Sequence, residues 1–163
     1  MTVSTTGGAT PRHYGFGSTA AIVTSLGLIV GFGGTGVSRA TIVNALLVIA
    51  IADNISDSLS MHVYQESEKL EARAAFRAMA TNFLARLIVT LTFVAIVLLL
   101  PLSLVPPVAL AWGVILLCVL SYALARHTAA RPWREMAKHV GVALAVVAVS
   151  RVLGNWITSH VQG

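Results

Sequence analysis

Five apolar runs, at residues 18–34, 40–63, 83–104, 108–124 and 140–157, dominate the sequence and are separated by short polar connections. An α-helix needs about 20 apolar residues to cross the hydrocarbon core of a bilayer. The pattern therefore predicts an all-α protein, an integral membrane bundle of five transmembrane helices that forms a single domain over residues 18–163. Residues 1–17 are rich in Gly and Thr, and we predict a flexible N-terminal tail there. They do not have the pattern of a cleaved signal peptide.

The composition agrees with a membrane protein. Hydrophobic residues make up 56% of the chain and charged residues only 10%, with a mean hydropathy of +0.83. A soluble domain normally carries about 25% charged residues. So few charges cannot cover a surface in contact with water, whereas a surface in contact with lipid needs none. The predicted partner of most of the surface is therefore the lipid bilayer.

The formal net charge of +5 would also suit a nucleic-acid-binding protein. The basic residues, however, lie between apolar runs and form no continuous face, so we expect no nucleic-acid partner. Arg12 precedes the first run, Lys69, Arg73, Arg77 and Arg86 follow the second, and Arg126, Arg131, Arg134 and Lys138 follow the fourth. The connection between the first two runs has only Arg39, and the connection between the third and fourth has no basic residue. Because cytoplasmic loops are enriched in Lys and Arg, this alternation predicts a cytoplasmic N-terminus and a C-terminus on the other side.

The second run carries the candidate chemistry. Asp53, Asp57, Met61 and Gln65 are spaced four residues apart, so they share one face of a helix. An ionisable group within a span costs about 2.5–3.5 kcal/mol on insertion scales, so the two aspartates must face a cavity, a partner helix or a cation. One interpretation is a cation path, with carboxylate oxygens and the softer Met61 thioether as ligands. The alternative is a polar helix interface, to which three further residues would contribute hydrogen bonds: Asn54, Ser56 and Ser58.

Arg151 lies inside the fifth run, where it either pairs with one of these aspartates across the bundle or extends toward the membrane surface. His62 and His139 each have the chemistry of a metal ligand or proton relay. Cys118 is the only cysteine, which excludes an internal disulfide and predicts a packing role. The sequence has no nucleophile–base pattern and no HExxH motif, and GFGGTG follows no strand, so we expect no enzyme.

The stretch around Met61 resembles the vacuolar iron transporter family. Asp53 matches the acidic residue of the family's second span, and Leu59-Ser60-Met61 matches its (L/I)SM motif eight residues later. The first run, with Thr24 and Gly31 in frame, is similar to the family pattern DG(I/L)xTxxxxVxG. The similarity extends from about residue 16 to the C-terminus. It implies five transmembrane helices, a homodimer, and exchange of Fe²⁺ or Mn²⁺ for protons.

The chain departs from the family at three places. Ala20 stands where the first span of the family has an Asp of the metal path, and Gln65 stands where Glu or Asp is usual. About fifteen residues replace the long Glu-rich domain found between spans two and three in the family's iron transporters. Asp57 is a candidate to compensate by adding a carboxylate one turn from Asp53.

These observations predict a divalent metal transporter for Fe²⁺ or Mn²⁺, without a permanently bound cofactor, in which protons are a plausible counter-substrate. The expected metal-binding residues are Asp53, Asp57, Met61, Gln65, Glu66, Glu68 and Glu71, the last three gathering cations at the cytoplasmic mouth. A homodimer is expected because one small bundle shields the two aspartates poorly. The alternative is a degenerate family member that serves as a membrane scaffold or partner subunit. The Ala- and Val-rich composition favours a bacterial inner membrane.

Overall fold

The computed structural model describes residues 11–33, 35–67, 72–128 and 132–161 and consists of five α-helices in that part of the chain. The helices are α1 (Pro11–Phe32), α2 (Arg39–Ser67), α3 (Ala72–Leu99), α4 (Val105–Thr128) and α5 (Pro132–Val161). No strand occurs among the described residues. The predicted all-α class is confirmed.

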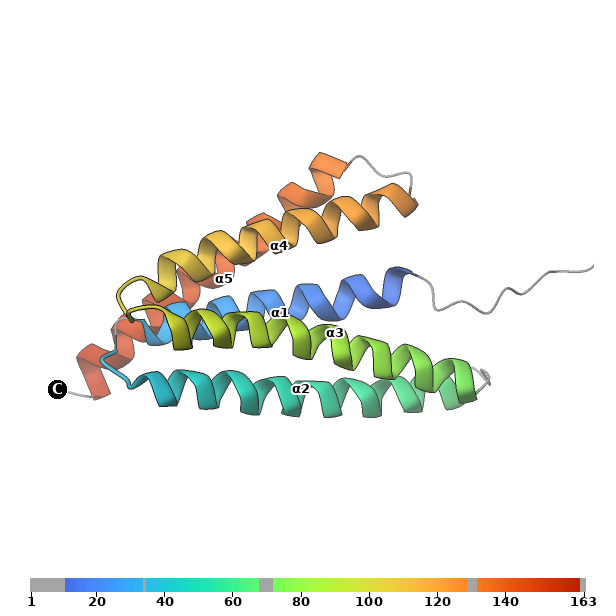
Figure 1. Cartoon of the computed structure of the whole chain (residues 1–163), viewed down its shortest axis with the longest axis horizontal. Helices are drawn as coiled ribbons and strands as arrows, with labels where there is room; N and C mark the ends of the chain where they lie inside the picture. Colours follow the sequence, from blue (N-terminus) through green and yellow to red (C-terminus); the bar gives the residue numbers. More distant parts are fainter. Residues whose placement is uncertain (1–10, 34, 68–71, 129–131, 162–163) are drawn as a thin grey trace, which may run out of the picture.

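Helix α1 lies at the centre of the bundle. It runs between the α2–α3 pair and the α4–α5 pair, and it contacts each of the other four helices (Figure 1). Helix α2 contacts α3 and α1, and over the described residues it has no contact with α4 or α5. The apolar core is made mainly by α1 together with α3 and α4. Its largest fully buried side chains include Ile22, Leu26, Ile29, Phe93 and Leu117.

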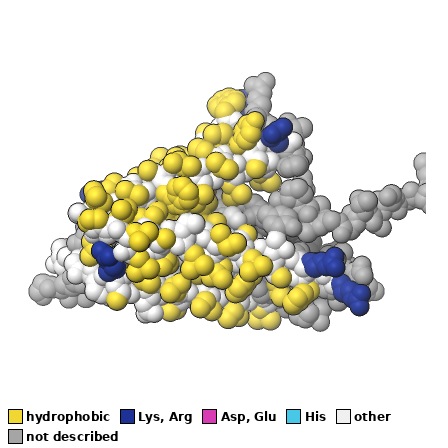
Figure 2. Space-filling view, in the orientation of Figure 1, with side chains coloured by type: hydrophobic (Ala, Val, Ile, Leu, Met, Phe, Trp, Pro, Cys, Tyr) yellow, Lys and Arg dark blue, Asp and Glu magenta, His cyan; other side chains and the backbone are white. Residues whose placement is uncertain are grey.

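Among the residues that the structure describes, four helices contain stretches that are long and apolar enough to cross a membrane, namely Arg39–Asp57, Met79–Leu99, Val105–Arg126 and Trp133–His160. The apolar part of α1, Gly17–Phe32, is shorter. On the face shown in Figure 2, apolar side chains cover the middle of the molecule, and Lys and Arg side chains appear at its two ends. An apolar belt between charged ends is the surface expected of a helical membrane protein.

Most helices extend beyond the predicted apolar runs, and the boundaries of α1 and α4 differ in an informative way. Helix α1 begins at Pro11, so residues 11–17, predicted as part of a flexible tail, are helical. The predicted runs 83–104 and 108–124 leave Pro106 and Pro107 in the turn between them, because proline ends helices, but both prolines occupy the first turn of α4. Proline is tolerated there because the first backbone N–H groups of a helix have no partner within it. The turn therefore covers only residues 100–104.

Small residues bring α1 and α5 into close contact. Gly27 and Gly31 of α1 face Ser150 and Gly154 of α5, and both pairs are spaced four residues apart. The Gly154 backbone lies directly against the carbonyl oxygen of Gly31, so that even a methyl group at position 154 would collide with it. Paired small residues at this spacing are the usual means by which helices pack closely in membranes.

Arg39, at the start of α2, stabilises the end of α3. Its guanidinium donates hydrogen bonds to the carbonyl oxygens of Leu98 at 2.7 Å and Leu100 at 3.0 Å. The last carbonyl groups of a helix lack partners within the helix and favour a nearby cation. This contact explains why a single arginine lies in an otherwise weakly charged loop.

We predict that Gly154→Ala destabilises the protein by about 1–3 kcal/mol, since α5 must move away from α1 to make room for the new methyl group. Gly141→Ala is the matched control, because position 141 lies on the same helix and a Cβ there meets nothing within 4 Å. The control should be neutral or slightly stabilising. Thermal unfolding of both variants in detergent micelles tests this, and equal melting temperatures would contradict the close α1–α5 contact.

Candidate functional site

The two aspartates of α2 lie on consecutive turns and on one side of the helix, as predicted. Their side chains are about half-buried, with 43% of Asp53 and 44% of Asp57 exposed. They are the only aspartates in the sequence. Asp57 is the last residue of the apolar stretch of α2, and Asp53 lies one turn inside it. The pair is therefore close to one end of the apolar belt.

Arg86 of α3 binds both aspartates. Its side chain is only 6% exposed, and its Nη2 donates to Asp53 Oδ2 at 3.2 Å while its Nη1 donates to Asp57 Oδ2. A guanidinium group presents its N–H donors in a planar fork, and this lets one arginine bridge two carboxylates. Asp53, Asp57 and Arg86 together are called the charged triad below.

This arrangement corrects the interpretation of Arg86 as one of the basic residues of a cytoplasmic loop. Arg86 lies within the apolar stretch Met79–Leu99 and is buried, so it does not mark the membrane surface. The physical reason is charge compensation, since an arginine buried within a membrane span pairs with acidic side chains or backbone carbonyl groups. The sequence contained a signal for this burial, because Arg86 lies seven residues after Met79, inside a long apolar stretch.

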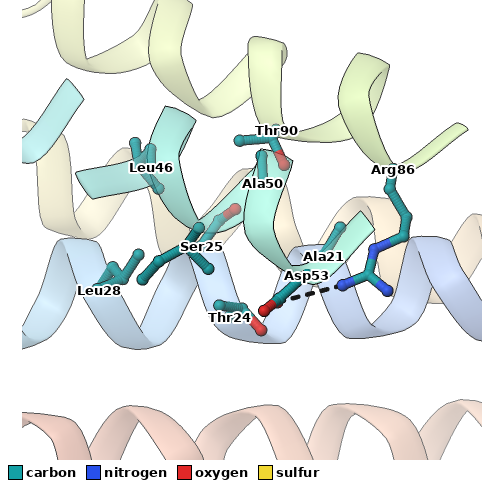
Figure 3. A pocket seen from close by; sticks show the side chains of 10 residues that line it. Ala21, Thr24, Ser25, Leu28, Leu46, Ala50, Asp53, Arg86 and Thr90 are labelled. Atoms are coloured by element: carbon teal, nitrogen blue, oxygen red, sulfur yellow. Dashed lines mark hydrogen bonds and ion pairs between the residues drawn. The ribbon is translucent and has the colours of Figure 1, made fainter. Parts of the chain in front are cut away.

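A small polar cavity borders the triad where α1, α2 and α3 meet. Its volume is about 10 Å³, and its lining includes Asp53 and Arg86 together with the hydroxyl-bearing residues Thr24, Ser25 and Thr90. Figure 3 shows these side chains around the Asp53–Arg86 ion pair. A cavity of this size and polarity holds about one water molecule. Thr24, which matches the transporter family's first-span pattern, thus lies beside the site.

The structure does not bring Arg151 to the aspartates. Arg151 is exposed on α5, and α5 has no contact with α2 in the described part of the chain. The alternative in which Arg151 pairs with Asp53 or Asp57 is therefore wrong. The close packing of α5 on the opposite side of α1 is the reason, because α1 separates the two helices (Figure 1).

The other predicted site residues are placed only in part. Met61, Gln65 and Glu66 belong to α2, which continues to Ser67, but their side chains are outside the described part of the structure, as is that of His62. Glu68 and Glu71 lie outside the described residues altogether. Whether these residues join the two aspartates stays a prediction.

His139 has a different neighbourhood. Its Nδ1 is hydrogen-bonded to the hydroxyl of buried Ser121 at 2.8 Å, which joins α5 to α4. Within the part of the chain that the structure describes, no three His, Cys, Asp or Glu side chains lie together as a metal site would require.

The charge of the triad defines what it can bind. Two carboxylates and one guanidinium sum to −2 + 1 = −1, so the site has one uncompensated negative charge near the end of the apolar belt. Such a site attracts cations and excludes anions. Comparison of the sequence with models of protein families and with curated proteins finds no match, so the assignment of function depends on this geometry and on the resemblance described above.

We predict that Arg86→Leu destabilises the protein by about 3 kcal/mol, because it leaves two neighbouring carboxylates without their counter-charge. Arg151→Leu removes the same charge and similar volume from an exposed position of α5, and it should change stability by no more than about 0.5 kcal/mol. Chemical unfolding in micelles provides the comparison. Equal losses in both variants would show that the triad does not stabilise the bundle.

Proposed function

We propose that this protein transports a divalent cation, Fe²⁺ or Mn²⁺, across a membrane, and that Asp53 and Asp57 bind the cation on its path. The observation that carries the proposal is the pair of half-exposed carboxylates on consecutive turns of α2, inside an apolar stretch and beside a polar cavity. Ionisable groups within a membrane span are costly, and they often mark the pathway of an ion or substrate. Transport accounts for the site better than catalysis, because the sequence offers no nucleophile beside a base.

The chemistry of α2 supports this choice of substrate. Carboxylate oxygens bind many divalent ions, and a thioether favours softer transition metals over Mg²⁺ or Ca²⁺. Met61 follows Asp53 by two helical turns on the same helix. We propose that Met61 and Gln65 extend the path beyond the aspartates, and that Glu66, Glu68 and Glu71 concentrate cations at its cytoplasmic end.

We also propose that all five helices span the membrane, with the N-terminus in the cytoplasm and the membrane being a bacterial inner membrane. Arg86 no longer counts as a cytoplasmic charge, but Lys69, Arg73 and Arg77 still follow the second apolar run and support the same orientation. Half-exposed carboxylates are poorly solvated by lipid, which favours a homodimer that covers this face of α2. The proposed counter-substrate is the proton, as in the transporter family that the chain resembles.

We predict that proteoliposomes containing the wild-type protein take up Fe²⁺ or Mn²⁺ under an imposed pH gradient, and that Asp53→Ala reduces the uptake rate by tenfold or more, a loss of about 1.4 kcal/mol or more of cation stabilisation. Glu135→Ala is the matched control. Glu135 is a carboxylate of α5 that pairs with Lys138 at 2.9 Å, and α5 does not contact α2. The control should transport like the wild type. Uptake by Asp53→Ala at the wild-type rate would contradict a path along α2.

A second function, a non-transporting scaffold or partner subunit, is favoured by two observations. Arg86 already compensates one of the two carboxylates, and Ala20 removes the acidic residue that the family has on its first span. Heat protection separates the two functions, since a ligand that binds the native state raises the melting temperature. Protection by Mn²⁺ that is lost in Asp53→Ala supports the transporter. Absence of protection together with absence of uptake supports the scaffold.

A further inference from the structure

We propose that Arg86 determines the cation specificity of this site, because its guanidinium is a tethered cation that competes with the metal for Asp53 and Asp57. This inference rests on the proposed function and concerns the same site. Its starting point is the asymmetry in burial between the partners. The Arg86 side chain is 6% exposed, whereas those of Asp53 and Asp57 are 43% and 44% exposed.

The asymmetry means that the aspartates can reach an incoming cation while Arg86 stays inside the bundle. Arg86 binds one oxygen of each carboxylate, the Oδ2 atoms of Asp53 and Asp57. A metal held between the same carboxylates would lie within a few ångströms of the guanidinium. Two positive groups at that separation repel strongly where water is scarce. Metal binding and the present position of Arg86 therefore oppose each other.

The sum of charges shows which cation the present arrangement favours. With Arg86 in place the triad has a charge of −1, so a singly charged cation makes the site neutral and a divalent cation leaves it at +1. With Arg86 withdrawn the two carboxylates have a charge of −2, and a divalent cation makes the site neutral. Because an uncompensated charge is costly in an apolar environment, a divalent cation binds well only after the guanidinium leaves.

The surroundings of Arg86 leave little space for that movement. The adjoining cavity has a volume of about 10 Å³, enough for about one water molecule but not for a guanidinium group. Its walls offer hydroxyl groups of Thr24, Ser25 and Thr90, which can accept hydrogen bonds from a displaced arginine (Figure 3). Because α1, α2 and α3 together enclose the cavity, enlarging it means that these helices move apart. Entry of the metal is thus coupled to a rearrangement of helices around the site.

The test compares Asp57→Asn with Asp57→Asn/Arg86→Gln in purified protein. Each variant retains one carboxylate, Asp53, and they differ only in the charge at position 86. This pair avoids the two uncompensated carboxylates that Arg86→Gln alone would leave, so folding is preserved more readily. Binding of Mn²⁺ is measured from the decrease of the electron paramagnetic resonance signal of the free ion. We expect the double variant to bind Mn²⁺ roughly 10- to 100-fold more tightly, as expected for removal of a nearby positive charge.

The proposal is overturned if the double variant binds Mn²⁺ no more tightly than Asp57→Asn while both proteins show the same helical circular dichroism. A gain that persists after Asp53→Asn is added also overturns it, because the metal then binds elsewhere. Uptake by wild-type proteoliposomes decides the proposed function separately. If the wild type takes up metal but the double variant does not bind Mn²⁺ more tightly, only the role of Arg86 is overturned. If the double variant binds Mn²⁺ more tightly but the wild type takes up no metal, competition at the site is supported and transport is overturned.

Discussion

The bundle depends on how closely the backbone of α1 approaches its neighbours. Lipid tails are as apolar as leucine, so helices in a membrane associate through close packing and not through the hydrophobic effect. Gly31 against Gly154 provides that packing between α1 and α5, and Gly113 of α4 leaves room for the buried side chain of Leu26. With α1 held in the centre, Thr24 and Ser25 lie opposite α2 and α3 and complete the walls of the polar cavity.

The second constraint is electrostatic and acts on the side of α1 that faces α2 and α3. Helix α2 contacts only α3 and α1 over the described residues, and its strongest polar link to the bundle is the bridge from Arg86 to Asp53 and Asp57. The same interaction links α2 to α3 and occupies the Oδ2 atom of each carboxylate. Under the proposed function a cation would need these carboxylates too, so the contact that holds α2 would compete with binding of the cation.

Three arginines show why sequence reasoning succeeded only in part. Arg39, Arg86 and Arg151 all stand in or beside apolar runs. From position alone, Arg39 and Arg86 were assigned to loops, and two alternatives were left open for Arg151. In the structure Arg39 binds the carbonyl groups at the end of α3, Arg86 is buried between the aspartates, and Arg151 is exposed on α5. Which of these outcomes an arginine adopts depends on the groups that other helices place within reach of its long side chain.

The sequence by itself determined the helical class, the approximate extent of the apolar segments and the shared face of Asp53 and Asp57. These features follow from composition and from the 3.6-residue period of the helix, both of which are local. Only the tertiary structure decided that α1 is central, that Pro106 lies in the first turn of a helix, and that Arg86 rather than Arg151 faces the aspartates. Which helices pack together depends on where small residues allow close approach and on which charges must be compensated. Both depend on the neighbouring helices, so the sequence of one helix does not reveal them.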